Sequence, residues 1–103
     1  LFVGSCFTEN IGQRFEVLKW RTIINPFGIT YNPVSIAACV GRLVDGARPY
    51  TRDDLRLHQG RYFSFDHHSV FSHPDPEQCL EGINRSLEQA GRALGSTDVV
   101  VVT

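Results

Sequence analysis

Two nucleophilic side chains stand next to each other near the start of the sequence, in the stretch Gly4-Ser5-Cys6-Phe7-Thr8. The apolar Leu1-Phe2-Val3 precedes this stretch and a helical pattern follows it, which predicts a turn between a strand and a helix. A glycine at the start of the turn allows a sharp bend. The first amides of a helix lack partners within the helix, and a helix N-terminus favours the thiolate form of a cysteine. The turn is therefore a candidate reactive site, with Cys6 or Ser5 as the nucleophile.

A second candidate loop follows the next apolar segment. Residues 20–24 form a short, mostly apolar segment that is rich in β-branched side chains, which predicts a buried strand. The turn-forming Asn25-Pro26-Phe27-Gly28 ends this segment. Asn25, Gly28 and Asn32 could donate N–H groups to negative charge that develops on a substrate oxygen. A purely structural interpretation stands beside this one, in which Gly28 forms a turn with positive φ and Asn32 caps the next helix. For Asn32 we favour the cap.

The elements that must position these loops alternate between strands and helices. The predicted helices run from about Glu9 to Leu18 with Thr8 as the cap, from Asn32-Pro33 to Gly46 and from Asp75-Pro76 to Gly95, and a terminal strand covers Val99–Thr103. This alternation predicts an α/β fold with an open, doubly wound parallel sheet. Ligands bind such sheets beyond the carboxyl ends of the strands, where both candidate loops would lie.

Residues 47–72 interrupt the alternation. Leu55–His58 and Arg61–Phe65 flank Gln59-Gly60, which predicts a small hairpin inserted in the crossover. A polar loop, Asp66-His67-His68-Ser69, follows the hairpin. His67 could contact a substrate there, and His68 could serve as a base if the loop folds back over the first turn. We expect no metal site, because adjacent histidines in an extended loop point in different directions and no helical pair or cysteine ligand accompanies them.

The composition narrows the class of protein. With 103 residues, 42% hydrophobic and 20% charged, the chain fits one soluble domain or a piece of one. A net charge of -1 with scattered arginines gives no reason to expect nucleic-acid binding, and no apolar run reaches the length of a membrane span. The three cysteines lie far apart, which predicts reduced thiols and a cytoplasmic location, with Cys39 and Cys79 buried as small apolar residues. We expect no cofactor, and the oligomeric state stays open.

Several stretches carry a family resemblance. Gly4-Ser5-Cys6-Phe7-Thr8 resembles the Gly-Ser-Cys-Phe-Ala motif after which the GSCFA domain family is named, with threonine in place of the final alanine. Asn25–Pro33, Phe65–Ser72 and Asp98–Thr103 are similar to further stretches of that family. The resemblance covers nearly the whole chain. Because both ends interrupt apolar strands, we expect residues 1–103 to form the N-terminal part of a single GSCFA domain.

The GSCFA family is similar in turn to the SGNH (GDSL-type) hydrolases, which are three-layer α/β/α enzymes of ester and acyl chemistry. The resemblance implies that Gly4 matches the glycine of their Gly-Asp-Ser-Leu block, Ser5 the acidic position, Cys6 the nucleophile and Phe7 the leucine. It also implies that Asn25-Pro26-Phe27-Gly28 corresponds to an Asn-x-x-Gly turn whose glycine amide helps to bind the oxyanion. The asparagine of the third block and the catalytic histidine with its acidic partner would lie beyond residue 103.

We therefore expect a hydrolase or acyltransferase of SGNH type that acts on a small-molecule, lipid or carbohydrate ester. The expected catalytic residues are Cys6, Ser5 and His68, and the expected oxyanion or substrate contacts are Gly28, Asn25, Asn32 and His67. The alternative is a non-catalytic module that binds a ligand or carbohydrate on the same scaffold. A cysteine phosphatase is excluded, because glycine occupies the place six residues after Cys6 where those enzymes need an arginine. No Gly-rich nucleotide-binding motif is present either.

Overall fold

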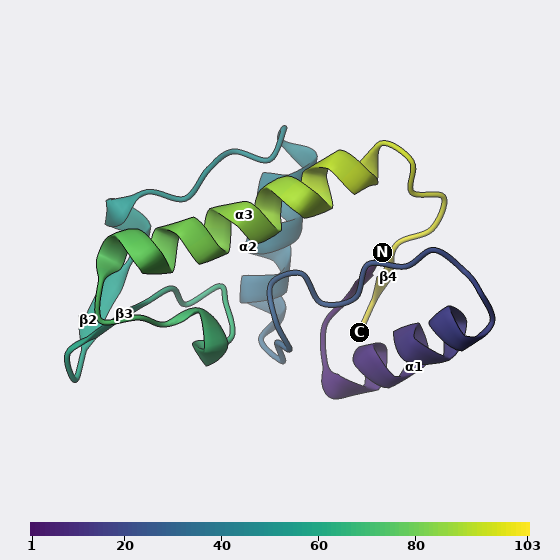
Figure 1. Ribbon diagram of the computed structural model, residues 1–103, viewed down its shortest axis with the longest axis horizontal. Coiled ribbons are helices and arrows are strands. Elements are labelled where there is room, and N and C mark those ends of the chain that lie inside the picture. The colour runs from purple at the N-terminus through teal and green to yellow at the C-terminus, as the bar shows by residue number, and fades with distance from the viewer.

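A computed structural model describes residues 1–103. The elements in chain order are β1 (Phe2–Val3), α1 (Cys6–Val17), α2 (Pro33–Val44), the short 3-10 helix η1 (Arg52–Asp54), β2 (Arg56–His58), β3 (Arg61–Phe63), the 3-10 helix η2 (Ser69–Phe71), α3 (Pro76–Leu94) and β4 (Val101–Val102). The α/β class is thus confirmed, with a short parallel sheet and a separate hairpin. In Figure 1, α1 lies on one side of the parallel strands and α2 and α3 lie on the other.

The parallel sheet has β1 at its centre. On one side β1 pairs with β4 in the register Phe2↔Val101 and Val3↔Val102. On the other side Phe2 forms a parallel bridge with Ile24 and accepts a hydrogen bond from the Asn25 amide at 2.8 Å. The turn after β1 therefore lies at the carboxyl edge of the sheet, together with the loop that begins at Asn25.

The strand predicted at residues 20–24 is reduced to the single bridge at Ile24. The physical reason is the end of α1, where Lys19 adopts a positive φ of 66°. Its amide donates to the Glu16 carbonyl and the Trp20 amide donates to the Phe15 carbonyl, which is the hydrogen-bond pattern of a Schellman cap. The Trp20 ring then packs on the Phe15 ring at a centroid distance of 5.6 Å, so Trp20 belongs to the helix cap and not to the sheet.

The helix α1 begins at Cys6, three residues before the predicted start, and Ser5 occupies the N-cap position in place of Thr8. Thr8 is fully buried within the first turn. Serine is a preferred N-cap residue, but the Ser5 side chain makes no capping hydrogen bond to the helix. The earlier start matters for the site, since it places Cys6 at the first position of the helix.

The other two helices begin where they were predicted. The Asn32 side chain accepts a hydrogen bond from the Val34 amide at 3.0 Å, and Pro33 opens α2. The Asp75 side chain accepts from the Glu77 amide at 3.0 Å, and Pro76 opens α3. Both helices thus follow the local signals of a polar cap and a proline in the first turn.

The hairpin is confirmed with shorter strands than predicted. Leu57 pairs with Tyr62, and the intervening Gln59 and Gly60 both have positive φ, as a tight two-residue hairpin turn requires. Leu55 lies outside the strand because it ends η1 and is buried in the core. The hairpin lies beside the N-terminal end of α3 in Figure 1, remote from α1.

A single hydrophobic core joins the sheet to α2, α3 and the start of the hairpin. Its buried members are Leu1, Val3, Phe27, Ile36, Cys39, Leu43, Tyr50, Leu55, Cys79, Ile83, Leu87 and Ala90. Cys39 and Cys79 are buried as predicted. Phe27, from the second candidate loop, belongs to this core, so the loop is anchored from within.

Candidate functional site

The first turn is held at the carboxyl end of β1 by its own backbone. Gly4 adopts a φ of 142°, in a region that side chains other than glycine rarely enter. Its carbonyl accepts a hydrogen bond from the Thr30 amide at 2.9 Å. A Cβ at this position would collide with the carbonyl of Thr103 at the end of β4. The turn, the second loop and the end of β4 therefore meet at Gly4.

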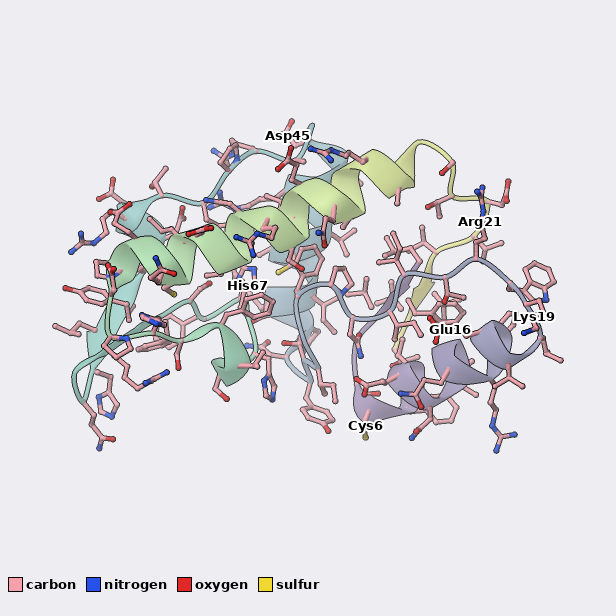
Figure 2. The ribbon with its side chains drawn as sticks, viewed as in Figure 1. Cys6, Glu16, Lys19, Arg21, Asp45 and His67 are labelled. Carbon is pink, nitrogen blue, oxygen red and sulfur yellow. The ribbon has the colours of Figure 1, made fainter.

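Cys6 is the exposed cysteine of the chain and stands at the first position of α1. The other two cysteines are buried, whereas the exposure of Cys6 shows that it does not serve as a packing residue of the core. The Phe7 amide donates no hydrogen bond within the protein, because the helix provides no acceptor for its first turn, whereas the Cys6 amide lies in hydrogen-bonding contact with the Tyr31 hydroxyl. An exposed thiol thus stands next to an unpaired backbone donor. Figure 2 shows Cys6 at one end of α1 and Lys19 at the other.

Tyr31 is a neighbour of Cys6 that the sequence did not reveal. A hydrogen-bonding contact between the Tyr31 hydroxyl and the Cys6 thiol is the main cause that raises the pKa of Tyr31 above its ordinary value. Repulsion from the Cys6 and Glu9 charges adds to the effect. The phenol therefore keeps its proton at neutral pH and can donate a hydrogen bond beside the thiol. No local motif marks Tyr31, which lies 25 positions after Cys6 in the sequence. Only the contact in the folded protein identifies it.

Ser5 has a different environment from Cys6. Its hydroxyl forms a hydrogen bond of 2.9 Å with the Thr103 hydroxyl, and the Thr103 hydroxyl also bonds to that of Thr8. Ser5 therefore belongs to a chain of three hydroxyls that ties α1 to the end of β4. The Ser5 hydroxyl thus bonds to the residue that follows β4 and not to the backbone of its own turn.

Asn25 connects the two candidate loops through its side chain. Its Oδ1 accepts a hydrogen bond from the Gly4 amide at 2.9 Å, and its Nδ2 donates to Glu9 Oε2 at 3.3 Å. The residue is buried and has a positive φ of 44°, which asparagine tolerates better than most residues. The carboxamide donor predicted to face a substrate oxygen therefore faces Glu9.

The remaining residues of the second loop have structural partners. The Gly28 amide donates to the Asn25 carbonyl at 2.8 Å, so the predicted oxyanion donor is occupied within its turn. Gly28 has a φ of 78°, as the turn interpretation requires. Asn32 caps α2, which was the favoured interpretation.

His68 lies beside the second loop and is exposed. Its amide donates to the Phe27 carbonyl at 3.1 Å, and its Cβ packs directly on Gly28. Its Nδ1 accepts a hydrogen bond from the Val70 amide at 3.1 Å, so the neutral ring carries its proton on Nε2. In this tautomer His68 can donate a hydrogen bond, but it has no free lone pair with which to take a proton from Cys6.

His67 is buried, although it was predicted to lie in a polar loop that contacts a substrate. Its ring lies edge-on to Tyr50, Phe71 and Phe27, at centroid distances of 4.7, 5.4 and 5.8 Å. Nδ1 bonds to the Ser64 hydroxyl at 3.0 Å, and Nε2 has no partner. Burial lowers the pKa of His67 to about 4. The prediction of a solvent-facing residue failed because the aromatic residues around it come from three separate segments.

An apolar cavity of about 840 Å³ lies at the amino end of the parallel strands, where Phe2 and Val101 of those strands help to line it. Its lining includes Phe15, Trp20 and Ile23 together with Lys19 and Arg21, which Figure 2 shows remote from Cys6. None of the predicted site residues lines it.

No group of three or more histidine, cysteine or acidic side chains is arranged to hold a metal ion. No helix is both long and apolar enough to cross a membrane.

The GSCFA family matches the sequence over residues 1–103. The chain belongs to the GSCFA family. Searches among curated proteins and among solved structures gave no match. In this GSCFA chain the serine and the cysteine of the motif have different surroundings. The Ser5 hydroxyl bonds to Thr103, which follows β4, and the Cys6 thiol is exposed to solvent.

Proposed function

We propose that this GSCFA chain carries the nucleophile of a hydrolase or acyltransferase of SGNH type, which acts on an ester or acyl group. One observation carries the proposal: Cys6 is an exposed thiol at the first position of α1, at the carboxyl end of the central strand of a parallel sheet. Ligand sites of open α/β sheets lie at this edge. The likeness of the GSCFA motif to the first block of SGNH enzymes supports the same position for the nucleophile, and the short α/β core is compatible with their three-layer fold.

The first chemical step follows from this arrangement. The Cys6 thiolate attacks the carbonyl carbon of the acyl group, and a carbon–sulfur bond forms while the carbonyl electron pair moves to oxygen. The unpaired Phe7 amide in the first turn of α1 donates a hydrogen bond to that oxyanion. When the tetrahedral intermediate collapses, the bond to the leaving alcohol breaks, the alcohol takes a proton, and a thioester on Cys6 remains. Water then releases the acid in a hydrolase, or an acceptor alcohol or amine takes the acyl group in a transferase.

The neighbours of Cys6 have separate roles in this proposal. Tyr31 keeps its proton and donates a hydrogen bond beside the sulfur or the leaving oxygen. Ser5 stabilises the turn through Thr103. His68 lies with its Cβ on Gly28, where its Nε2–H can contact a substrate. The base that activates Cys6 is expected outside these contacts, as in the SGNH enzymes that the motif resembles.

The second candidate function is a non-catalytic binding module. The observation that favours it is the exposure of two aromatic side chains near the thiol, those of Phe7, which is next to Cys6 in the sequence, and of Tyr31, which contacts Cys6. Aromatic faces of this kind bind sugars and other small ligands. Small-molecule, lipid and carbohydrate esters are the proposed ligands of either function, and the three free cysteines fit a reducing, cytoplasmic compartment.

Turnover of an activated short-chain ester by the intact protein tests the proposal. Cys6→Ala should lower kcat/KM by about 100-fold or more, whereas Ser5→Ala should keep it within about 10-fold. Hydrolysis that survives replacement of both residues would refute the proposal. Saturable binding of an ester or sugar without turnover, unchanged in Cys6→Ala, would favour the binding module.

A further inference from the structure

We propose that Asn25 and Glu9 form a positioning pair that fixes the Cys6 turn, so that Asn25 acts on the reactive thiol through Gly4 and not through a substrate. The inference rests on the proposed function, because it assigns the residues that hold the proposed nucleophile in place. Its evidence is the hydrogen bonding of Asn25, which is independent of any assumed substrate.

Asn25 uses all of its polar groups within the fold. Its backbone amide donates to the Phe2 carbonyl at 2.8 Å and its carbonyl accepts from the Gly28 amide at 2.8 Å. Its side chain accepts from Gly4 and donates to Glu9. A buried polar residue that is satisfied in this way has one defined geometry, because each alternative rotamer leaves a buried group unpaired.

The bond to the Gly4 amide is the one that reaches the site. Gly4 lies two residues before Cys6 and its backbone conformation sets the direction in which α1 begins. The bond is buried, so water does not compete for it. Asn25 Oδ1 therefore fixes the bend from which the first turn of α1 presents the thiol.

Glu9 supplies the second half of the device. It lies on α1 one turn after Cys6 and accepts a hydrogen bond from Asn25 Nδ2. An amide that donates to a carboxylate cannot rotate by half a turn without turning its oxygen toward that carboxylate. Glu9 thus selects the orientation in which the Asn25 oxygen faces Gly4, and it links α1 directly to the second loop.

The test exchanges the amide group of Asn25 and the carboxylate group of Glu9. Asn25→Asp keeps an acceptor for Gly4 but sets two carboxylates against each other. The double variant Asn25→Asp/Glu9→Gln restores one amide and one carboxylate, with the hydrogen bond reversed and the net charge unchanged. The readout is the rate at which iodoacetamide alkylates Cys6 at pH 7, because Cys6 is the exposed cysteine and alkylation needs no acyl chemistry.

We expect Asn25→Asp to change the alkylation rate about fivefold or more, which corresponds to the net contribution of one ordinary hydrogen bond, and the double variant to return it to within about twofold of the starting protein. Asn10→Asp is the matched control, since it adds a carboxylate on the same helix at an exposed position. An equal change in Asn10→Asp, or no recovery in the double variant, would overturn the proposal.

A second comparison decides the case if Asn25→Asp does not fold. Glu9 is only partly buried, so its variants leave the core intact. Glu9→Gln keeps an acceptor for Asn25 and should alkylate at close to the starting rate, whereas Glu9→Ala removes the acceptor and should differ about threefold or more. Equal alkylation rates for Glu9→Gln and Glu9→Ala would refute the proposal that Asn25 and Glu9 form a positioning pair. Recovery by the exchanged pair without any ester turnover would sustain the pair and refute only the proposed function.

Discussion

Gly28 packs directly beneath His68, and a Cβ at Gly28 would collide with the Cβ of the histidine. The two residues come from the second candidate loop and from the segment after the hairpin, and the His68 amide also donates to the Phe27 carbonyl. There are therefore two reasons why position 28 requires a glycine. It allows the positive φ of the turn, and it leaves room for the loop that carries His68.

Gly28→Ala should therefore destabilise the protein by about 3 kcal/mol, as the sum of backbone strain and overpacking. The measurement is the free energy of unfolding from urea titration. Gly46→Ala is the matched control, because Gly46 has the same φ of 78° and no atom within 4 Å of an added Cβ. The control should lose about 1 kcal/mol, from strain alone. Equal losses in the two variants would show that the contact with His68 contributes nothing.

Lys19 is expected to be a site at which the protein can be stabilised. It occupies the left-handed position of the Schellman cap, where glycine is the usual residue. Lys19→Gly should raise the free energy of unfolding by about 0.5–1 kcal/mol, because it removes the strain of a side chain at positive φ. Lys19→Ala keeps that strain and should change little. A gain in Lys19→Ala as large as that in Lys19→Gly would assign the effect to the lysine charge and not to the backbone.

His67 should make stability depend on pH. Burial lowers the pKa of His67 from 6.5 to about 4, so between these values the unfolded chain binds more protons than the folded one. The free energy of unfolding therefore falls as the pH falls from 6.5 to 4, by about 3 kcal/mol in total, and is unaffected by this group above that range. Chemical denaturation at a series of pH values measures this slope.

Two variants separate His67 from the other titrating groups. His67→Phe keeps an aromatic ring among Tyr50, Phe27 and Phe71 and should remove most of the slope. The matched control is His58→Gln, which removes an exposed imidazole from β2. Burial raises the pKa of Asp66, which opposes the effect of His67, so the difference between starting protein and variant is the informative quantity. A His67→Phe protein with the original slope would contradict this account.

The three cysteines should react very differently with an alkylating agent. Burial raises the pKa of Cys39 to about 12 and also raises the pKa of Cys79, whereas Cys6 is exposed. Under native conditions iodoacetamide should therefore add one group, on Cys6, and in strong denaturant it should add three. Intact-mass and peptide-mapping measurements check this. Native modification of Cys39 or Cys79 at a rate similar to that of Cys6 would show that the core opens readily.

Elements with local signals could be predicted from the sequence. Asn32-Pro33 and Asp75-Pro76 begin their helices as predicted, and Gln59-Gly60 forms the hairpin turn, because cap and turn preferences act within a few residues. The start of α1 could not be predicted in this way. Ser5 and Thr8 are both acceptable cap residues by type, and the hydroxyl of Ser5, the observed cap, bonds to Thr103 at the far end of the sequence and not to the helix.

The position of the candidate turn in the fold could be predicted from the sequence, whereas the contacts of the residues around it could not. The position of Cys6 at the carboxyl edge follows from the order of strand, turn and helix. The roles of Asn25 and His67 depend on partners that are remote in sequence, Glu9 for the first and the aromatic residues around the second. Such contacts arise only when the chain is folded, so residue type and spacing did not reveal them.

The most direct test of the proposed nucleophile is the site of acylation when the intact protein is mixed with an activated short-chain ester and quenched in acid. Peptide mapping by mass spectrometry should find the acyl group on Cys6 as a thioester that hydroxylamine removes at neutral pH. Cys6→Ala should abolish this adduct, and Ser5→Ala should retain it. An adduct on Ser5, or no adduct on the Gly4–Thr8 turn while the ester is turned over, would contradict the account.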